Sequence, residues 1–81
     1  DFTLYPSPSS GLITIEHNNS TLAENAEFQI FDLHGRLLSS GKIAQDAKTT
    51  TIDVASLSSA LYYVRITNGP AIVDTLSFVR L

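Results

Sequence analysis

The chain has 81 residues, of which 43% are hydrophobic, and a formal net charge of −3. This length, without any low-complexity tract, predicts one compact domain over residues 1–81. The few cations are scattered singly, which excludes a basic surface for nucleic acid or anionic membranes, and the lack of cysteine excludes disulfides and thiolate chemistry.

Apolar and polar residues alternate in short runs bounded by Gly, Pro, Ser, Asn and Asp, a pattern typical of β-strands. In chain order we expect strands at 2–5, 12–17, 26–33, 36–43, 50–54, 61–67 and 71–81, with a polar loop at 18–25. About seven strands with turn signals at this spacing predict an all-β fold, a small Ig-like antiparallel β-sandwich. No run approaches the ~18 apolar residues of a membrane helix, so we expect no membrane insertion.

The segment Asp32-Leu33-His34-Gly35 between the third and fourth strands predicts a hairpin turn. The Asp32 carboxylate can accept from backbone N–H groups two residues on, and Gly35 can adopt a positive φ. The alternative is that Asp32 and His34 are catalytic groups or metal ligands. Two residues do not complete a typical zinc site, and His17, the other histidine, lies at the end of a different strand.

The later elements carry three more expectations. Asp53 can cap a short helical turn at 53–57, which would be a connector. Tyr62 is expected to be buried with its hydroxyl bonded to upstream backbone, as in a tyrosine corner, while Tyr63 faces outward. In the last strand we expect Leu76 and Phe78 to point inward and Arg80 to share their side.

Four blocks of the sequence together resemble the type IX (Por) secretion system C-terminal sorting domains of Bacteroidetes proteins. The blocks are LYPSPSSGLITI, IFDLHGRLL, IDVASLSSALYYVRI and SFVRL, in the family's order and over nearly the whole chain. The resemblance makes the following residues its structural motif: Pro6, Pro8, Gly11, Asp32, Gly35, Asp53, Leu57 and Tyr62. It assigns recognition to the last four residues, Phe78, Val79, Arg80 and Leu81.

Three positions depart from the family pattern. Ser7 replaces an Asn, Ala60 a Gly and Ser77 a Lys. Because an L-residue at positive φ costs on the order of 1 kcal/mol, we predict a negative φ for Ala60. Loss of the Lys at Ser77 would weaken recognition and leave the fold intact.

The resemblance implies a non-catalytic signal without metal or cofactor, at the C-terminus of a larger secreted protein. It implies passage through the periplasm, an outer-membrane translocon as partner, and a sortase-like cysteine peptidase that removes the domain and can attach the cargo to the cell surface. The chain starts without Met, and we expect it to be a fragment. Recognition of an edge strand through backbone hydrogen bonds would suit the last strand, and exposed edges could also form a homodimer.

The alternative function is a carbohydrate-binding or adhesion module appended to a secreted enzyme. It requires an exposed aromatic platform, and alignment of Tyr5, Phe31 and Tyr63 on one face would favour it. An enzyme is disfavoured because the sequence offers no Gly-framed Ser nucleophile and no plausible pair of carboxylates.

Overall fold

The computed structural model describes residues 2–17, 26–44 and 48–81, so the loop predicted at 18–25 lies outside the described residues. Seven strands are present: β1 (Phe2–Tyr5), β2 (Leu12–His17), β3 (Ala26–Phe31), β4 (Leu37–Lys42), β5 (Thr49–Asp53), β6 (Ala60–Asn68) and β7 (Ala71–Arg80). The predicted strands are confirmed with small shifts of their ends. The largest shift is in the third strand, which stops at Phe31 because the side chain of Asp32 already bonds to the turn.

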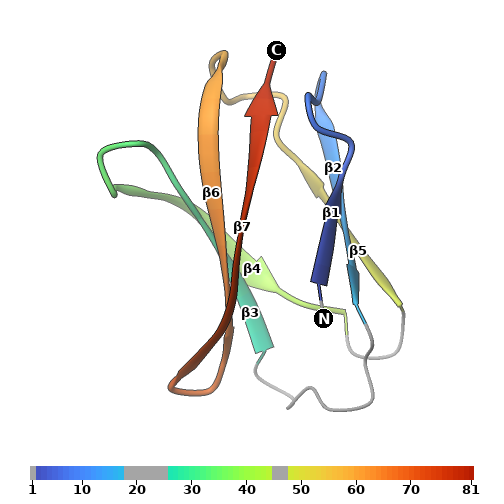
Figure 1. The fold of residues 1–81 in the computed structure, drawn as a ribbon, viewed down its shortest axis with the longest axis vertical. Coiled ribbons are helices and arrows are strands. Elements are labelled where there is room, and N and C mark those ends of the chain that lie inside the picture. Colours follow the sequence, from blue (N-terminus) through green and yellow to red (C-terminus); the bar gives the residue numbers. More distant parts are fainter. Residues whose placement is uncertain (1, 18–25, 45–47) are drawn as a thin grey trace.

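The strands form two antiparallel sheets that face each other (Figure 1). One sheet has the order β1-β2-β5 and the other the order β4-β3-β6-β7. This arrangement confirms the predicted all-β sandwich. The order also places β7 and β4 at the two edges of the larger sheet. None of the described segments is a helix that could cross a membrane.

The core lies between the two sheets and follows the alternation of the sequence. Its completely buried members include Ile13 and Ile15 on β2 and Val64 and Ile66 on β6. Because side chains alternate across a strand, the intervening residues point to solvent. The buried apolar set comprises Ile13, Ile15, Ala26, Phe28, Ile30, Ile43, Ile52, Val54, Tyr62, Val64, Ile66 and Phe78.

One histidine belongs to this interior. His17 is only 4% exposed, its Nε2 lies 3.2 Å from the Thr50 hydroxyl, and its ring packs beside Phe2. Its Nδ1 is buried without a hydrogen-bond partner. Burial lowers the pKa of His17 below 6.5, because desolvation disfavours the charged imidazolium. The period-two pattern does place residue 17 on the inner face, together with Ile13 and Ile15.

Candidate functional site

The four sequence blocks meet at one end of the sandwich, the end that carries the C-terminus in Figure 1. The β1–β2 loop, the β3–β4 hairpin and the β5–β6 connection reach this end together with the last residues of β7. Antiparallel topology explains the meeting, because β1, β3, β5 and β7 all run toward this end. Residues far apart in the sequence thereby form one surface.

The β1–β2 loop is bonded to the end of β7. The Ser9 N–H donates to the Val79 carbonyl (2.7 Å), and the Leu81 N–H donates to the Ser9 carbonyl (2.9 Å). The Val79 N–H donates to the Ser7 hydroxyl (3.1 Å), so the Ser that replaces the usual Asn provides an acceptor for the last strand. The C-terminal end of β7 is therefore attached to its own chain.

Ser9 is the residue of this loop that sequence reasoning missed. Its side chain is fully buried, its hydroxyl donates to the Leu12 carbonyl (2.7 Å), and it accepts from the Gly11 N–H (3.2 Å). Pro6 and Pro8, the residues singled out from the sequence, are exposed, and the peptide bonds that precede them are cis. A serine in a Ser- and Pro-rich loop carries no periodic signal, so only the tertiary contact with β7 identifies it.

Arg80 is bonded to the turn that follows β5. Its Nε donates to the Val54 carbonyl (3.1 Å), one terminal amino group donates to the Ala55 carbonyl (3.1 Å), and the other bonds the Leu81 carbonyl. The prediction that Arg80 shares the side of Leu76 and Phe78 is confirmed. This cation therefore holds two parts of the fold together.

The turn after β5 has the predicted cap without a helix. The Asp53 carboxylate accepts from the Ala55 N–H (2.9 Å), and the Leu57 N–H donates to the Val54 carbonyl (3.1 Å). The chain then enters β6 at Ala60, where φ is negative as predicted, since no described residue other than glycine has a positive φ.

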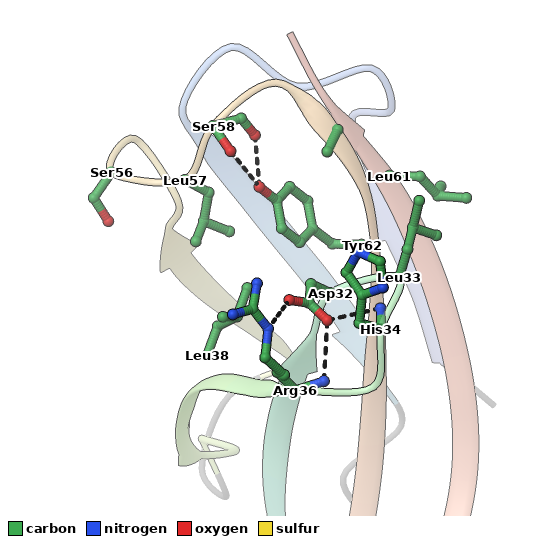
Figure 2. Close-up of a pocket in the computed structure, with 11 residues that line it drawn as sticks. Asp32, Leu33, His34, Arg36, Leu38, Ser56, Leu57, Ser58, Leu61 and Tyr62 are labelled. Atoms are coloured by element: carbon green, nitrogen blue, oxygen red, sulfur yellow. Dashed lines mark hydrogen bonds and ion pairs between the residues drawn. The ribbon is translucent and has the colours of Figure 1, made fainter.

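Tyr62 forms the predicted tyrosine corner (Figure 2). Its ring is buried and stacks on Phe78, with the ring centroids 5.5 Å apart. Its hydroxyl donates to the Ser58 carbonyl (2.6 Å) and lies 3.2 Å from the Ser58 hydroxyl. Leu57 packs against the same core. These contacts fix the connection between the two sheets, because the bond joins β6 to the loop that arrives from β5.

The β3–β4 hairpin is the predicted turn. The Asp32 carboxylate accepts from the backbone N–H groups of His34 (2.8 Å) and Arg36 (3.0 Å) and from Nε of Arg36 (2.7 Å). Gly35 has φ +81° and donates its N–H to the Asp32 carbonyl. The backbone N–H of Arg36, together with the Arg36 side chain and the His34 N–H, lowers the pKa of Asp32 below 3.8. Asp32 is thus an ionised carboxylate that stabilises the turn in which it lies.

A hollow of about 400 Å³ lies between this hairpin and the 56–60 loop (Figure 2). Its apolar lining includes four leucines: Leu33, Leu38, Leu57 and Leu61. Two of its polar groups are engaged within the domain, because Asp32 pairs with Arg36 and Ser58 bonds Tyr62. Within the described ranges, no three Asp, Glu, His or Cys side chains gather as a metal site requires. The hollow suits an apolar contact better than a reaction.

The four predicted recognition residues are divided by the fold. Phe78 is buried in the core and Arg80 is half-buried, whereas Val79 and Leu81 are exposed. Of the three rings that bear on carbohydrate binding, Phe31 and Tyr63 are cross-strand neighbours on the larger sheet, and Tyr5 lies on the smaller one. The three rings therefore do not form a single platform.

Comparison with known families identifies the chain. A model described as a secretion system C-terminal sorting domain matches residues 3–77, and no curated protein matches the chain. The match covers the first three of the four blocks completely and reaches the first residue of the last block. It confirms a non-catalytic signal that directs an exported protein across the outer membrane through the secretion machinery. The chain belongs to the family of type IX (Por) secretion system C-terminal sorting domains.

Proposed function

We propose that the outer-membrane translocon recognises the open edge of β7, and that this domain is the C-terminal part of a larger secreted protein. The observation that carries the proposal is the position of β7 at the edge of the four-stranded sheet. An edge strand offers unpaired backbone groups to which a partner strand can bond.

The structure divides this edge into two parts. At the C-terminal end, Val79 already bonds the β1–β2 loop through both its N–H and its carbonyl. Because backbone groups alternate in direction along a strand, Ser77 and Thr75 direct theirs to the same side. The Thr75 N–H is taken by the Asp74 carboxylate (2.8 Å). The Ser77 backbone is therefore the centre of the proposed contact.

The four predicted recognition residues have two different roles in this proposal. Val79 and Leu81 would contact the translocon through exposed apolar side chains, whereas Phe78 and Arg80 would hold the strand in place. The first and third blocks hold the end of β7 through the bonds that Ser7, Ser9, Val54 and Ala55 form with it. Their role is to present β7 in a fixed position.

Family membership supports the later steps of export in this proposal. The domain would pass through the periplasm and be removed by a sortase-like cysteine peptidase, with the cargo joined to a surface lipopolysaccharide or released. We also propose that the open edges of β4 and β7 allow the isolated domain to form a homodimer, since both strands end a sheet. Sedimentation of the domain over a range of concentrations tests the dimer.

The experiment fuses residues 1–81 to a fluorescent protein that is exported to the periplasm of a host with the type IX apparatus. Removing the residues after Ser77 is a blunt test, because it also removes Phe78 from the core and Arg80 from its bonds. A Ser77→Pro variant is sharper, because proline removes one edge N–H and leaves the groups that face β6 in place. Ser77→Ala is its control, since it changes only the exposed side chain.

The wild-type and Ser77→Ala fusions should reach the cell surface or the medium, and the Ser77→Pro fusion should stay in the periplasm. Thermal unfolding of the three isolated domains checks that each is folded. Export of a folded Ser77→Pro fusion at the wild-type level would show that the translocon does not recognise the edge of β7. Retention of every fusion in the periplasm would contradict the sorting role of this chain.

A further inference from the structure

The outward face of the larger sheet carries an aromatic row beside a polar row. Phe31 on β3 lies opposite Tyr63 on β6, which lies opposite Ser77 on β7. The next row on the same face contains Gln29, Arg65 and Thr75, in the same strand order. Cross-strand neighbours on one face lie within contact distance of each other, so the two rows form one continuous surface.

Arg65 is held in a fixed position on this surface. Its guanidinium carbon lies 4.5 Å from the centroid of the Phe31 ring, and its Nε donates to the Gln29 side-chain carbonyl (3.0 Å). A stacked and hydrogen-bonded guanidinium loses little further freedom when it binds a ligand. With Nε engaged, the two terminal amino groups are the donors that a ligand would meet.

The charge of Arg65 is not matched by an acid. Among the described residues, Asp32 and Arg36 form an ion pair, and no carboxylate forms one with Arg65. A hollow of about 460 Å³ lies in front of it, between the hairpin at 31–35 and the side chains of Tyr63, Arg65 and Thr75. Asp32 also borders this hollow, but its carboxylate is neutralised by Arg36.

We propose that this face binds an acidic saccharide. The sugar ring would pack on the exposed ring of Tyr63, and its carboxylate would accept two hydrogen bonds from the terminal amino groups of Arg65. The Thr75 hydroxyl, on the neighbouring strand, would contact a ring hydroxyl. Tyr63 and Arg65 are two residues apart on β6, roughly 6.6 Å along the strand, a separation that a sugar ring and its exocyclic carboxylate can span.

The charge of the chain favours a saccharide over an anionic membrane. Binding to a lipid surface draws on several clustered cations. This chain has a net charge of −3, and its face offers one fixed cation beside an aromatic ring. That combination selects a small ligand with a single acid group. The proposal does not depend on export, so its test is separate.

The test titrates the isotope-labelled 81-residue chain with tri-galacturonic acid and follows its backbone amide resonances by NMR. Neutral galactotriose and phosphatidylglycerol vesicles serve as the two comparison ligands. We expect shifts at Phe31, Tyr63 and Arg65 with the acidic trisaccharide, with a Kd near the millimolar range. Galactotriose should bind at least ten-fold more weakly, because it lacks the group that Arg65 recognises.

Variants locate the site. Arg65→Gln should weaken binding of the acidic trisaccharide about ten-fold or more, and Tyr63→Ala about three- to ten-fold. Lys42→Gln is the matched control: Lys42 on β4 lies opposite Glu27 on the same outward face, so its loss removes a cation from that face outside the hollow. It should change the affinity less than about two-fold. Arg65→Lys, which keeps the charge without the planar fork, should lie between wild type and Arg65→Gln.

Several outcomes would overturn the proposal. These are equal affinity for the neutral and acidic trisaccharides, wild-type affinity in a folded Arg65→Gln variant, or an equal loss in Lys42→Gln. Shifts with the vesicles and none with the trisaccharide would assign the face to a lipid instead. The absence of any shift up to about 10 mM trisaccharide would also refute it, because a prepared site should bind more tightly than that.

Discussion

The tyrosine corner gives the most direct test of how this small domain is held together. Replacement of Tyr62 by Phe keeps the ring on Phe78 and removes only the hydroxyl that donates to the Ser58 carbonyl at 2.6 Å. A hydrogen bond of this kind contributes about 0.5–1.5 kcal/mol net. Ser58 is exposed, so water can reach its carbonyl and limit the loss. We expect the free energy of unfolding to fall by about 1 kcal/mol.

In a domain of this size, such a loss lowers the melting temperature by roughly 4–8 °C. The measurement is thermal and urea unfolding followed by circular dichroism, with the urea dependence unchanged if the hydroxyl affects only the folded state. Tyr63→Phe is a matched control, because Tyr63 is the next residue on β6 and points to solvent. It should change stability by less than about 0.5 kcal/mol. Equal stability of the two variants would refute the role given to the corner.

Three further predictions concern stability. Gly35→Ala should cost about 1 kcal/mol through its φ of +81° alone, since a Cβ at that position meets nothing within 4 Å. Gly41→Ala should cost about 1–3 kcal/mol, because its Cβ would lie 2.7 Å from the Phe28 ring. Urea unfolding of both variants measures the difference in the free energy of unfolding. Because burial lowers the pKa of His17, the unfolded chain binds a proton there that the folded domain does not. Stability should therefore fall as the pH drops below 6.5, and a His17→Phe variant should lack this pH dependence. The lowered pKa of Asp32 adds stability that is present above pH 3.8 and lost as pH falls through the folded pKa, and Asp32→Asn should remove this acid dependence.

The end of the sandwich explains how four separated motifs can serve one function. Ser9, Val54 and Ala55 receive the last strand through backbone contacts, and Arg80 completes them. A change in the first or the third block would therefore shift β7 without altering its own residues. This arrangement predicts that export defects from motif variants track the position of β7 more closely than overall stability.

Much of the fold was readable from local patterns. Alternating Ile13 and Ile15 predicted a strand with one buried face, and Asp32 with Gly35 predicted the hairpin, because turn chemistry acts over four residues. Tyr62 was assigned correctly because a buried phenol needs a partner and the nearest backbone lies just upstream.

Other features depend on contacts between distant segments. The buried Ser9 bonds residues some 70 positions away, and the Arg65 guanidinium lies over Phe31 on a neighbouring strand. The burial of His17 arises from Phe2 and Thr50, which belong to the strands on either side of β2. No periodicity in the sequence reports such pairs.

The sequence by itself determined the strands, the turns and the family, because alternation, turn residues and ordered motifs are local properties of the chain. Only the tertiary structure decided which strands are neighbours and which lie at the edges of the sheets. It bonded Arg80 to the 54–55 turn and left the Ser77 backbone at the edge of a sheet, because strand order and register are set by packing between sheets.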